Sequence, residues 1–442
     1  MWKNKLFAAL LGLLLVMPAS PVGAQDSLVL KALIDKVLIE NYSLRISRNQ
    51  AAMAANNNSL GRAGFLPEVY VEGSQNISTY NTRQELFTGV VREGASARNT
   101  ALNALVNVNW NIFDGFMMFA QRDKLGYLEN LGAFETRYLI EQTVGDVVLA
   151  YYQLVRETAM LRNLEAQLHT SRFRYELERK RMDIGAGNAL QLNQAQVDYF
   201  SDSSAFLEQR NLIRGLEIQI NTFTQTNPAA PFMIADTGFN LVPLLPMDAA
   251  GARAREIHPE LKMAQLEELI SAADLRIQRA AYYPVIGLFG RYSYAYQTSE
   301  IGFAETSRSL GPQFGISIRM NLFNGGVTRM DTRNALKQLE NASLSEDRTL
   351  YLLLADLELL YSRHASYGHQ LGLALQNLEA ANRSFSIART QWEQGRIDGY
   401  EFRLTQLAQV NAGHQVIRLQ HILKTIEVEI DLRTGGLAER YL

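Results

Sequence analysis

The sequence contains no cysteine among its 442 residues. This absence excludes a disulfide framework, and it excludes attachment of a lipid to a cysteine beside a cleavage site. Beyond the first 25 residues, no stretch approaches the roughly 18 consecutive apolar residues of a transmembrane helix. Basic and acidic residues nearly balance, at 43 and 45, so the basic excess typical of nucleic-acid-binding proteins is missing. We therefore expect no nucleic-acid partner.

The first residues show the three zones of a secretory signal peptide. Lys3 and Lys5 are basic, residues 6–17 form an apolar run too short to span a membrane, and Val22-Gly23-Ala24 supplies small residues for cleavage. We expect a signal peptide over residues 1–24; the alternative is a buried N-terminal helix. An exported chain without a transmembrane helix is either a soluble periplasmic or extracellular protein or an outer-membrane β-barrel, whose alternating strands escape hydropathy searches.

The second half of the sequence repeats the first. Residues 62–67 (RAGFLP) match residues 279–284 (RAAYYP) at an offset of 217, whereas residues 110–115 (WNIFDG) match residues 320–325 (MNLFNG) at an offset of 210. The first copy is therefore longer by seven residues, and the extra residues fall in a loop between the two matches. We expect one repeat over 25–226, a linker over 227–246, a second repeat over 247–436 and a tail over 437–442.

Alternation marks the strands. Over residues 101–113, apolar side chains such as Leu102, Val106 and Trp110 share one face, and asparagines share the other. Residues 285–296 and 316–322 alternate likewise. A half-buried soluble sheet gives this pattern, and so does a membrane barrel with apolar residues toward lipid and polar residues toward a wet lumen. The expected strand length of about 10 to 13 residues suits a tilted membrane crossing.

Long helices are predicted over residues 116–182 and 327–393, which are almost free of proline and carry leucines at spacings of three, four and seven. Each would reach roughly 100 Å at about 1.5 Å per residue. Glycine-containing turns at Gly185 and Gly395 end them, and returning helices are expected over 189–224 and 400–434. Helices of this length belong to coiled-coil-like walls, whose apolar stripes require partners.

Four residues mark the switches between helix and strand. Pro67 and Pro284 come where a helical pattern gives way to alternation, because proline disfavours helix in the residue before it. Asp114 and Asn324 mark the reverse switch and are good N-cap residues for the following helices.

Together these features resemble the TolC-like outer-membrane efflux protein family. The resemblance is carried by Pro67 and Pro284 before strands, by the NIFDG and NLFNGG segments after strands, and by the Gly185 and Gly395 turns. It covers about residues 27–436. Each motif alone is weak, and their order, duplication and spacing make the match specific.

The resemblance implies a mainly α protein with a membrane β-barrel. Long helical hairpins would form a periplasmic α-barrel, and four strands per protomer would join a trimeric twelve-stranded β-barrel in the bacterial outer membrane. Segments 77–100 and 297–310 would be surface loops. The implied partners are two further copies of the chain in a homotrimer, a periplasmic adaptor (membrane fusion) protein, an inner-membrane RND or ABC transporter, and outer-membrane lipid.

The resemblance also assigns candidate sites. The helix turns would dock the adaptor, and the first turns of the returning helices would form a periplasmic aperture that closes at rest. Glu401 matches an acidic aperture position, but the next expected acid is Leu404, and the first copy has Gln191; a solvated helix charge remains the other interpretation of Glu401. The candidate residues are Gly185, Ala186, Gly187, Gly395, Arg396 and Ile397 for docking, Gln191 and Glu401 for the aperture, and Glu68, Glu72, Asn107, Asn109, Arg291 and Arg319 for the barrel lumen.

Enzyme signatures are missing. The sequence has no Gly-x-Ser-x-Gly, His-Glu-x-x-His or P-loop pattern, and His414 and His421, which could share a helix face, are more typical of helix-surface histidines than of a metal site. We expect no cofactor and no catalysis. The predicted function is a passive exit duct of a tripartite efflux or type I secretion system. The alternatives are a secreted structural coiled coil or adhesin with a soluble sheet and, less favoured because of the long helices, a diffusion porin.

Overall fold

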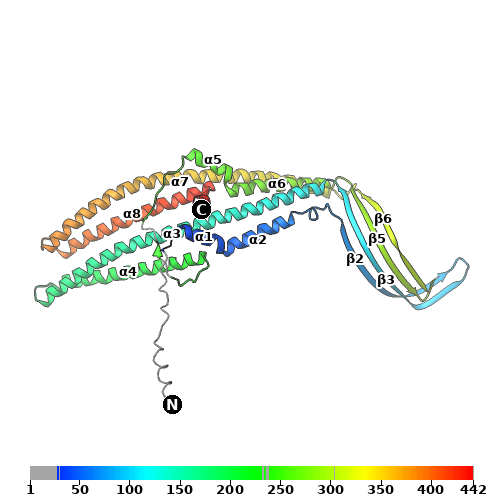
Figure 1. The fold of residues 1–442 in the computed structure, drawn as a ribbon, viewed down its shortest axis with the longest axis horizontal. Coiled ribbons are helices and arrows are strands. Elements are labelled where there is room, and N and C mark those ends of the chain that lie inside the picture. Colours follow the sequence, from blue (N-terminus) through cyan, green and yellow to red (C-terminus); the bar gives the residue numbers. More distant parts are fainter. Residues whose placement is uncertain (1–26, 29, 231–232, 235–237, 303, 442) are drawn as a thin grey trace, which may run out of the picture.

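The computed structural model describes residues 27–28, 30–230, 233–234, 238–302 and 304–441. The predicted signal peptide lies outside these residues. Figure 1 shows an elongated molecule in which long helices occupy most of the length and a curved sheet forms one end. Among the described helices, none combines the length and the apolar content that a membrane crossing needs.

Two helices of 67 residues each dominate the helical region. They are α3 (Met117–Asp183) and α7 (Val327–Glu393), and they confirm the predicted spans to within one residue. Each turns back into an antiparallel partner, α4 (Ala189–Phe223) or α8 (Gly399–Thr434), again close to the predicted bounds. The two hairpins are thus built alike, as the repeat predicts.

Shorter helices complete the layer. Helix α2 (Tyr42–Asn57) packs on α3, and α6 (Pro259–Ala280) packs between α3 and α7. Figure 1 shows α2 and α4 along one side of α3, with α6 and α8 between α3 and α7. The α2/α4 column and α7 are therefore the two outer walls of the layer.

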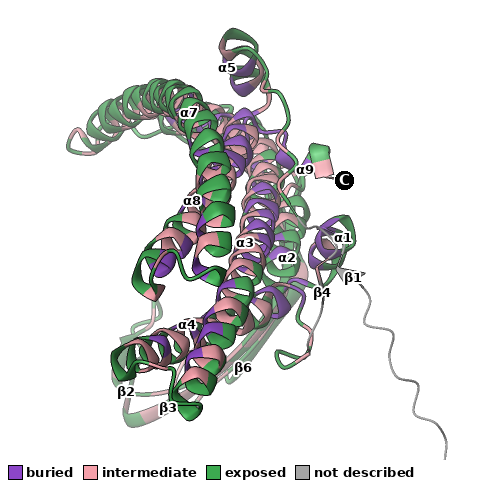
Figure 2. Ribbon diagram, turned by 90° about the vertical axis from the view of Figure 1, so that its left-hand side faces the viewer, coloured by how far each residue is buried: buried purple, intermediate pink, exposed green. Residues whose placement is uncertain are grey.

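Small elements gather near the middle of the molecule. They are β1 (Ser27–Leu28), α1 (Leu30–Glu40), β4 (Met233–Ile234), α5 (Met247–Ile257) and α9 (Leu437–Tyr441). The largest apolar core lies here, where α1, α3, α4, α8 and α9 meet around Ile34, Tyr151, Ile220 and Leu437. In Figure 2 buried residues follow α3, whereas α7 is mostly exposed.

The sheet has four antiparallel strands in the order β2-β3-β5-β6. The strands are β2 (Glu68–Glu85), β3 (Val91–Asp114), β5 (Val285–Ser299) and β6 (Thr306–Arg319). Each edge strand, β2 or β6, has a neighbour on one side only within the described residues. The sheet consequently presents two open edges.

The predicted surface loops over 77–100 and 297–310 are wrong in extent. The first hairpin remains paired out to Glu85 and Val91, with one register shift near Tyr80, and the connection is residues 86–90. In the second hairpin the connection is residues 300–305. The predicted strand length of 10 to 13 residues also falls short of the 18 and 24 residues of β2 and β3. Backbone pairing continues after the side-chain alternation that predicts a strand has faded.

The registers of the two hairpins are the same. Glu68 lies opposite Asn109 in the first, and Val285 lies opposite Arg319 in the second. Shifting the first pair by the repeat offsets of 217 and 210 gives Val285 and Arg319. The two offsets deduced from sequence matches are therefore also the offsets of the backbone pairing.

The apolar face of β3 is the more exposed face. Leu102 and Trp110 are 40% and 41% exposed, whereas Asn103 and Asn107 on the opposite face are half-buried. A soluble sheet packed on a core shows the reverse arrangement. The alternation thus places apolar side chains outward and amide side chains on the other face.

Each long helix begins in a left-handed turn. The N-cap of α3 is Phe116 and that of α7 is Gly326, rather than the predicted Asp114 and Asn324. The predicted hydrogen bond nevertheless exists, because the Asp114 carboxylate accepts from the Met118 amide at 3.1 Å. Asp114 lies two residues before the N-cap, and its carboxylate still provides an acceptor for a free amide in the first turn of the helix.

Gly115 and Gly325 provide a matched pair for a stability measurement. Both have φ near +70°, but a Cβ at Gly115 would lie 2.4 Å from the Ala280 carbonyl oxygen, whereas Gly325 faces open space. We expect Gly325→Ala to lower the free energy of unfolding by about 1 kcal/mol and Gly115→Ala by about 3 kcal/mol or more. Urea unfolding of the purified protein followed by far-UV circular dichroism measures both; equal losses would contradict the packing argument.

His258 shows where the copies diverge at a helix start. Its counterpart Asn41 caps α2, accepting from the amides of Ser43 and Leu44 at 2.9 and 3.3 Å. His258 precedes α6 without a side-chain cap and is buried, with no hydrogen-bond partner for Nδ1. Burial, together with the charge of Arg433, lowers the pKa of His258 to about 4.

We expect His258→Asn to stabilise the protein more at pH 5 than at pH 8. The unfolded histidine protonates near pH 6.5 and the folded one near 4, so stability is lost as the pH falls through this window. Asparagine removes that loss and supplies the cap, which is worth about 1 kcal/mol at either pH. Thermal unfolding at both pH values measures the difference, and a gain independent of pH would refute the histidine contribution.

Candidate functional site

The two helix turns have the same backbone geometry. After α3, the Gly185 amide donates to the Met182 carbonyl at 3.0 Å and the Ala186 amide to the Arg181 carbonyl at 2.9 Å. After α7, Gly395 and Arg396 make the equivalent bonds at 3.0 and 2.8 Å. Both glycines have φ above +70°. Each turn is thus a Schellman motif that glycine makes accessible.

The six predicted docking residues lie at the free ends of the hairpins. Gly185, Ala186, Gly395 and Arg396 are exposed, whereas Gly187 and Ile397 are half-buried. Gly187 has no room for a side chain, because a Cβ would lie 2.5 Å from the Met182 amide nitrogen. Figure 1 shows both turns at the end of the molecule farthest from the sheet.

The predicted aperture residues begin the returning helices. Asp398 caps α8 by accepting from the amides of Tyr400 and Glu401 at 2.9 and 2.8 Å, which leaves the Glu401 side chain exposed. Asn188 caps α4 by accepting from the Leu190 amide at 2.8 Å, and Gln191 is half-buried. The structure therefore places Glu401 and Gln191 at equivalent backbone positions with different exposure.

Packing around the second turn is aromatic. The ring of Phe402 stacks on Trp392 at 4.9 Å, and Ile397 packs against this pair. The corresponding residues of the first turn are Leu192 and Met182, and Met182 is exposed. The backbones of the turns match, but the second turn is more firmly anchored.

A buried polar network joins the two hairpins above the turns. The Arg403 guanidinium of α8 donates to both carboxylate oxygens of Asp202 on α4, at 2.7 and 2.8 Å. Gln167 of α3 donates to the same carboxylate at 2.6 Å. Arg174 of α3 pairs with Asp198 and donates to the Gly399 carbonyl at 3.1 Å. Sequence reasoning missed this network, although charged residues inside buried helix stripes were the available signal.

The six predicted lumen residues share one face of the sheet. Glu68 lies opposite Asn109, and Asn107 lies opposite Arg291. Glu72 is four residues from Glu68 along β2, and Arg319 lies opposite Val285, which is six residues from Arg291 along β5. Ordered across the strands, the polar face runs from an acidic β2 through an asparagine-rich β3 to arginines on β5 and β6. The structure thus brings together the residues that the sequence assigned to the lumen.

The two histidines of α8, His414 and His421, are half-buried near the Glu157 carboxylate of α3. The Glu157 side chain of α3 accepts from Gln209 at 2.7 Å and from Arg156. Burial lowers the pKa of His414, and burial together with Arg156 lowers that of His421 to about 4. Across the described residues, no three acidic, histidine or cysteine side chains are grouped as metal ligands.

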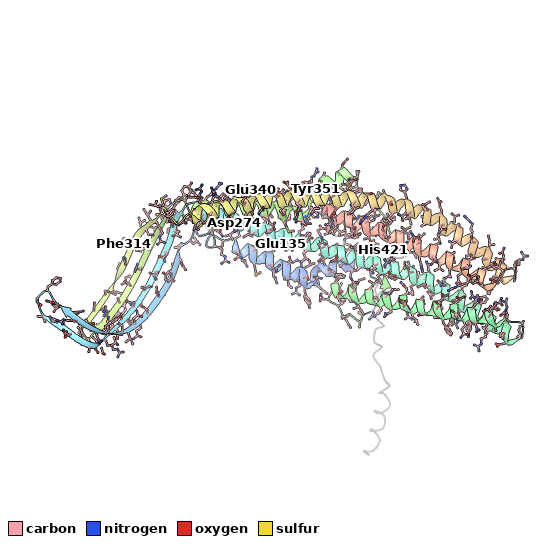
Figure 3. All side chains as sticks on the ribbon, turned by 180° about the vertical axis from the view of Figure 1, so that it is seen from behind. Glu135, Asp274, Phe314, Glu340, Tyr351 and His421 are labelled. Atoms are coloured by element: carbon pink, nitrogen blue, oxygen red, sulfur yellow. The ribbon has the colours of Figure 1, made fainter. Side chains whose placement is uncertain are left out.

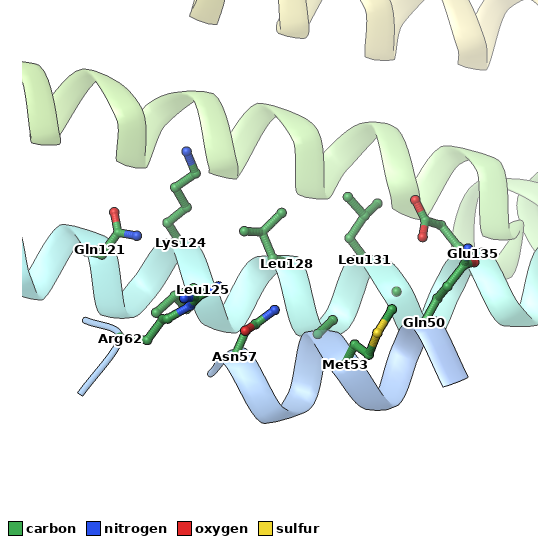
Figure 4. A pocket seen from close by; sticks show the side chains of 12 residues that line it. Gln50, Met53, Asn57, Arg62, Gln121, Lys124, Leu125, Leu128, Leu131 and Glu135 are labelled. Carbon is green, nitrogen blue, oxygen red and sulfur yellow. The ribbon is translucent and has the colours of Figure 1, made fainter. Parts of the chain in front are cut away.

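A groove of about 680 Å³ lies between α2 and α3 (Figure 4). Leu125, Leu128 and Gly132 line it from α3, and Met53 and Asn57 line it from α2. Lys124 points out of the groove toward α6, where its ammonium lies 2.6 Å from Asp274, a residue labelled in Figure 3. This cation therefore links helices.

Comparison with known proteins identifies the class. The chain belongs to the outer membrane efflux protein family, whose model matches residues 33–222 and 251–436. It is therefore an outer-membrane protein of a channel family, as the sequence resemblance predicted. The assignment argues against a secreted adhesin with a soluble sheet.

Two curated relatives illustrate the match. Protein CyaE of Bordetella pertussis is 26% identical over 371 residues, which cover 78% of this chain and 72% of that protein. The probable efflux pump outer membrane protein TtgC of Pseudomonas putida is 24% identical, over 67% of this chain and 56% of its own length. The chain thus spans little more than half of the TtgC sequence.

Solved structures confirm the fold. The CusC channel gives a TM-score of 0.76 at 17% identity and covers 92% of each chain. The outer membrane protein VceC of Vibrio cholerae gives 0.75 at 16% identity, covering 92% of this chain and 96% of its own. The Campylobacter jejuni CmeC outer membrane channel gives 0.78 at 14% identity, with 92% and 86% covered.

The buried network predicts an unequal cost for removing charges. We expect Asp202→Ala to lower the free energy of unfolding by about 3 kcal/mol, because the buried Arg403 guanidinium loses both of its hydrogen bonds to a carboxylate and keeps only the Asp198 carboxylate, 3.5 Å from its Nε. The control Glu393→Ala breaks an exposed pair with Arg389 and should cost less than about 1 kcal/mol. The double variant Asp202→Leu/Arg403→Met should recover most of the loss. Urea unfolding measures all three, and an equal cost for both single variants would contradict the prediction.

Proposed function

We propose that the protein is the outer-membrane exit duct of a tripartite efflux or type I secretion system. Three copies would close into one tube that conducts substrate passively from the periplasm to the exterior. The observation that carries the proposal is the inverted sheet: apolar side chains are exposed on one face, amide and charged side chains share the other, and both edges are open. A helical region roughly 100 Å long continues this sheet.

The open edges support the assembly. Unpaired backbone amides and carbonyls cannot remain in lipid, so four strands must join others in a closed barrel. Three copies supply twelve strands. The apolar face would then contact lipid, and Glu68, Glu72, Asn107, Asn109, Arg291 and Arg319 would line the lumen.

The outer walls of the helical layer support the same closure. Leu352, Leu359 and Leu373 are exposed on α7 at spacings of seven and fourteen, and Tyr351 projects beside them (Figure 3). On α4, Leu190 and Val197 are exposed seven residues apart. Heptad-spaced apolar residues are the seam of a coiled coil, so α7 of one copy would pack on the α2/α4 column of the next.

The implied partners follow from the family. Curated relatives are described as efflux pump outer membrane proteins, which supports a periplasmic adaptor and an inner-membrane RND or ABC transporter as partners. The adaptor would dock on the turns around Gly185 and Gly395, where exposed backbone lies at the free end of each hairpin. Energy would come from the pump, and the duct itself would only open and close.

Opening would separate the hairpins near the turns. The Arg403–Asp202 pair joins α8 to α4, and Glu401 precedes Arg403 by two residues on α8. In a trimer, three Glu401 side chains around the axis would form one acidic ring. Adaptor docking would release the hairpins from this resting arrangement.

A planar-bilayer measurement tests the duct and its aperture together. We expect the purified trimer to form conducting pores, and Glu401→Lys to weaken block by multivalent cations by about tenfold or more through loss of the acidic ring. The control Glu379→Lys changes an exposed α7 carboxylate paired with Arg383 and should leave block unchanged.

Two results would contradict these expectations in different ways. A chain that carbonate extracts from membranes and that conducts no current would overturn the duct. Pores whose cation block is the same in Glu401→Lys and wild type would overturn the aperture role alone.

A further inference from the structure

Strand β6 ends earlier than its counterpart in the first repeat. By the offset of 210, β6 should continue to Asn324 as β3 continues to Asp114. It stops at Arg319 instead, and Leu322 and Phe323 beyond it are 87% and 85% exposed. The same stretch of sequence is therefore a strand in one repeat and unpaired in the other.

The difference lies in the neighbouring strand. The ladder between β2 and β3 ends at the Glu68–Asn109 pair, so residues 110–114 are held as a strand by β5 alone. Strand β6 has β5 on one side and nothing on the other within the described residues. Pairing with β5 holds the end of β3 in the sheet, so the end of β6 needs pairing with a further strand. The repeat offset of 217 makes β2 the counterpart of β5, and β2 forms the second open edge of the sheet.

We infer that β6 of one copy pairs with β2 of the next in the register that β3 and β5 adopt inside each copy. The inference rests on the proposed assembly and adds its register. Because the hairpin registers coincide under both repeat offsets, the offsets can be applied to the β3–β5 pairing as well. The pair Asn109–Phe289 then becomes Arg319 of one copy opposite Glu72 of the next. The pair Asn107–Arg291 becomes Ser317 opposite Ser74.

Charge supports this register independently of the repeat. Arg319 and Glu72 are both exposed, both lie on the polar face, and neither forms an ion pair within the described part of the chain. Directly opposite residues of an antiparallel pair are close enough for opposite charges to attract. A slip by two residues would place Arg319 opposite Tyr70 or Ser74, and a slip by one would turn every side chain to the other face.

The register also explains the frayed end of β6. Met320 and Asn321 would lie opposite Val71 and Tyr70 of the next copy and extend the strand to the length of β3. Apolar residues at this end would join the outward face beside Trp110. Assembly would thus order a segment that is exposed in a single copy.

Cysteine pairs test the register, and the absence of native cysteine makes the test clean. Ser317→Cys is combined in turn with Glu72→Cys, Ser74→Cys and Asn76→Cys, and the purified trimer is oxidised and run on non-reducing gels. We expect the fastest intermolecular disulfide with Ser74→Cys, because opposite Cα atoms lie about 4.5–5.5 Å apart, within disulfide range. Ser78→Cys is a matched control. Ser74 and Ser78 are both half-buried on the polar face of β2, but Ser78 lies about 13 Å from Ser74 along the strand.

Charge reversal tests the ion pair. Arg319→Glu and Glu72→Arg should each lower the temperature at which the trimer dissociates in detergent, and the double variant should regain at least about half of that loss. Arg291→Glu is the control, because Arg291 lies on the same face opposite Asn107 of its own copy. It should leave the dissociation temperature unchanged.

The outcomes separate the inference from the proposed function. A stable trimer that cross-links fastest at position 72, 76 or 78, or at none of the four, overturns the register while the duct stands. Additive losses in the double charge variant overturn the ion pair. A wild-type protein that is not trimeric overturns the assembly, and the register falls with it.

Discussion

Unpaired backbone on the two edges of the sheet is the constraint on which the rest of this structure depends. A strand edge carries a row of amides and carbonyls that need partners, and lipid supplies none. Strands β2 and β6 leave such rows open. The helical layer also lacks neighbours at its two sides, because α7 and the α2/α4 column carry exposed apolar residues there. A single copy is thus a segment of a wall rather than a self-contained body.

The two repeats share their backbone geometry, and they differ in the side chains at their turns and between their hairpins. The turns after α3 and α7 share hydrogen bonds, glycine conformation and cap position. Their side chains differ: Trp392 and Phe402 anchor the second turn, whereas the first has Met182 and Leu192. The polar network between the hairpins likewise joins unlike residues, with the acid on α4 and the base on α8. The backbone therefore preserves the geometry of the ends, and the side chains set how firmly each end is held.

Sequence patterns predicted the long helices well because their signal is redundant. Spacings of three, four and seven recur over 67 residues, and glycine marks the end of each helix. The offsets were also recoverable, since they depend on short motifs at the switches between helix and strand. The extent of β2 and β3 was not predicted, because backbone bonds rather than alternating side chains hold residues 77–100 together.

The site was predicted unevenly for a related reason. Lumen candidates could be assigned to one face because strand side chains alternate by position. The Arg403–Asp202 pair was not found, since its members are 201 residues apart and their proximity depends on how the two hairpins pack. Asp114 accepts a hydrogen bond from a free helix amide, as the sequence predicts, but the N-cap residue is the left-handed Phe116, which leaves no pattern in the sequence.

The first and last described helices share one core. Leu33 and Ile34 of α1 belong to the same apolar cluster as Leu437 and Ala438 of α9, and the Glu141 carboxylate of α3 accepts the Ala438 amide at 2.9 Å. Contacts between segments so distant along a chain form late, because closing the intervening loop costs entropy before any contact forms. The middle of the protomer therefore cannot finish folding until the last residues have been delivered. A chain without α9 would lack Leu437 and Ala438 in this core and would leave the core open.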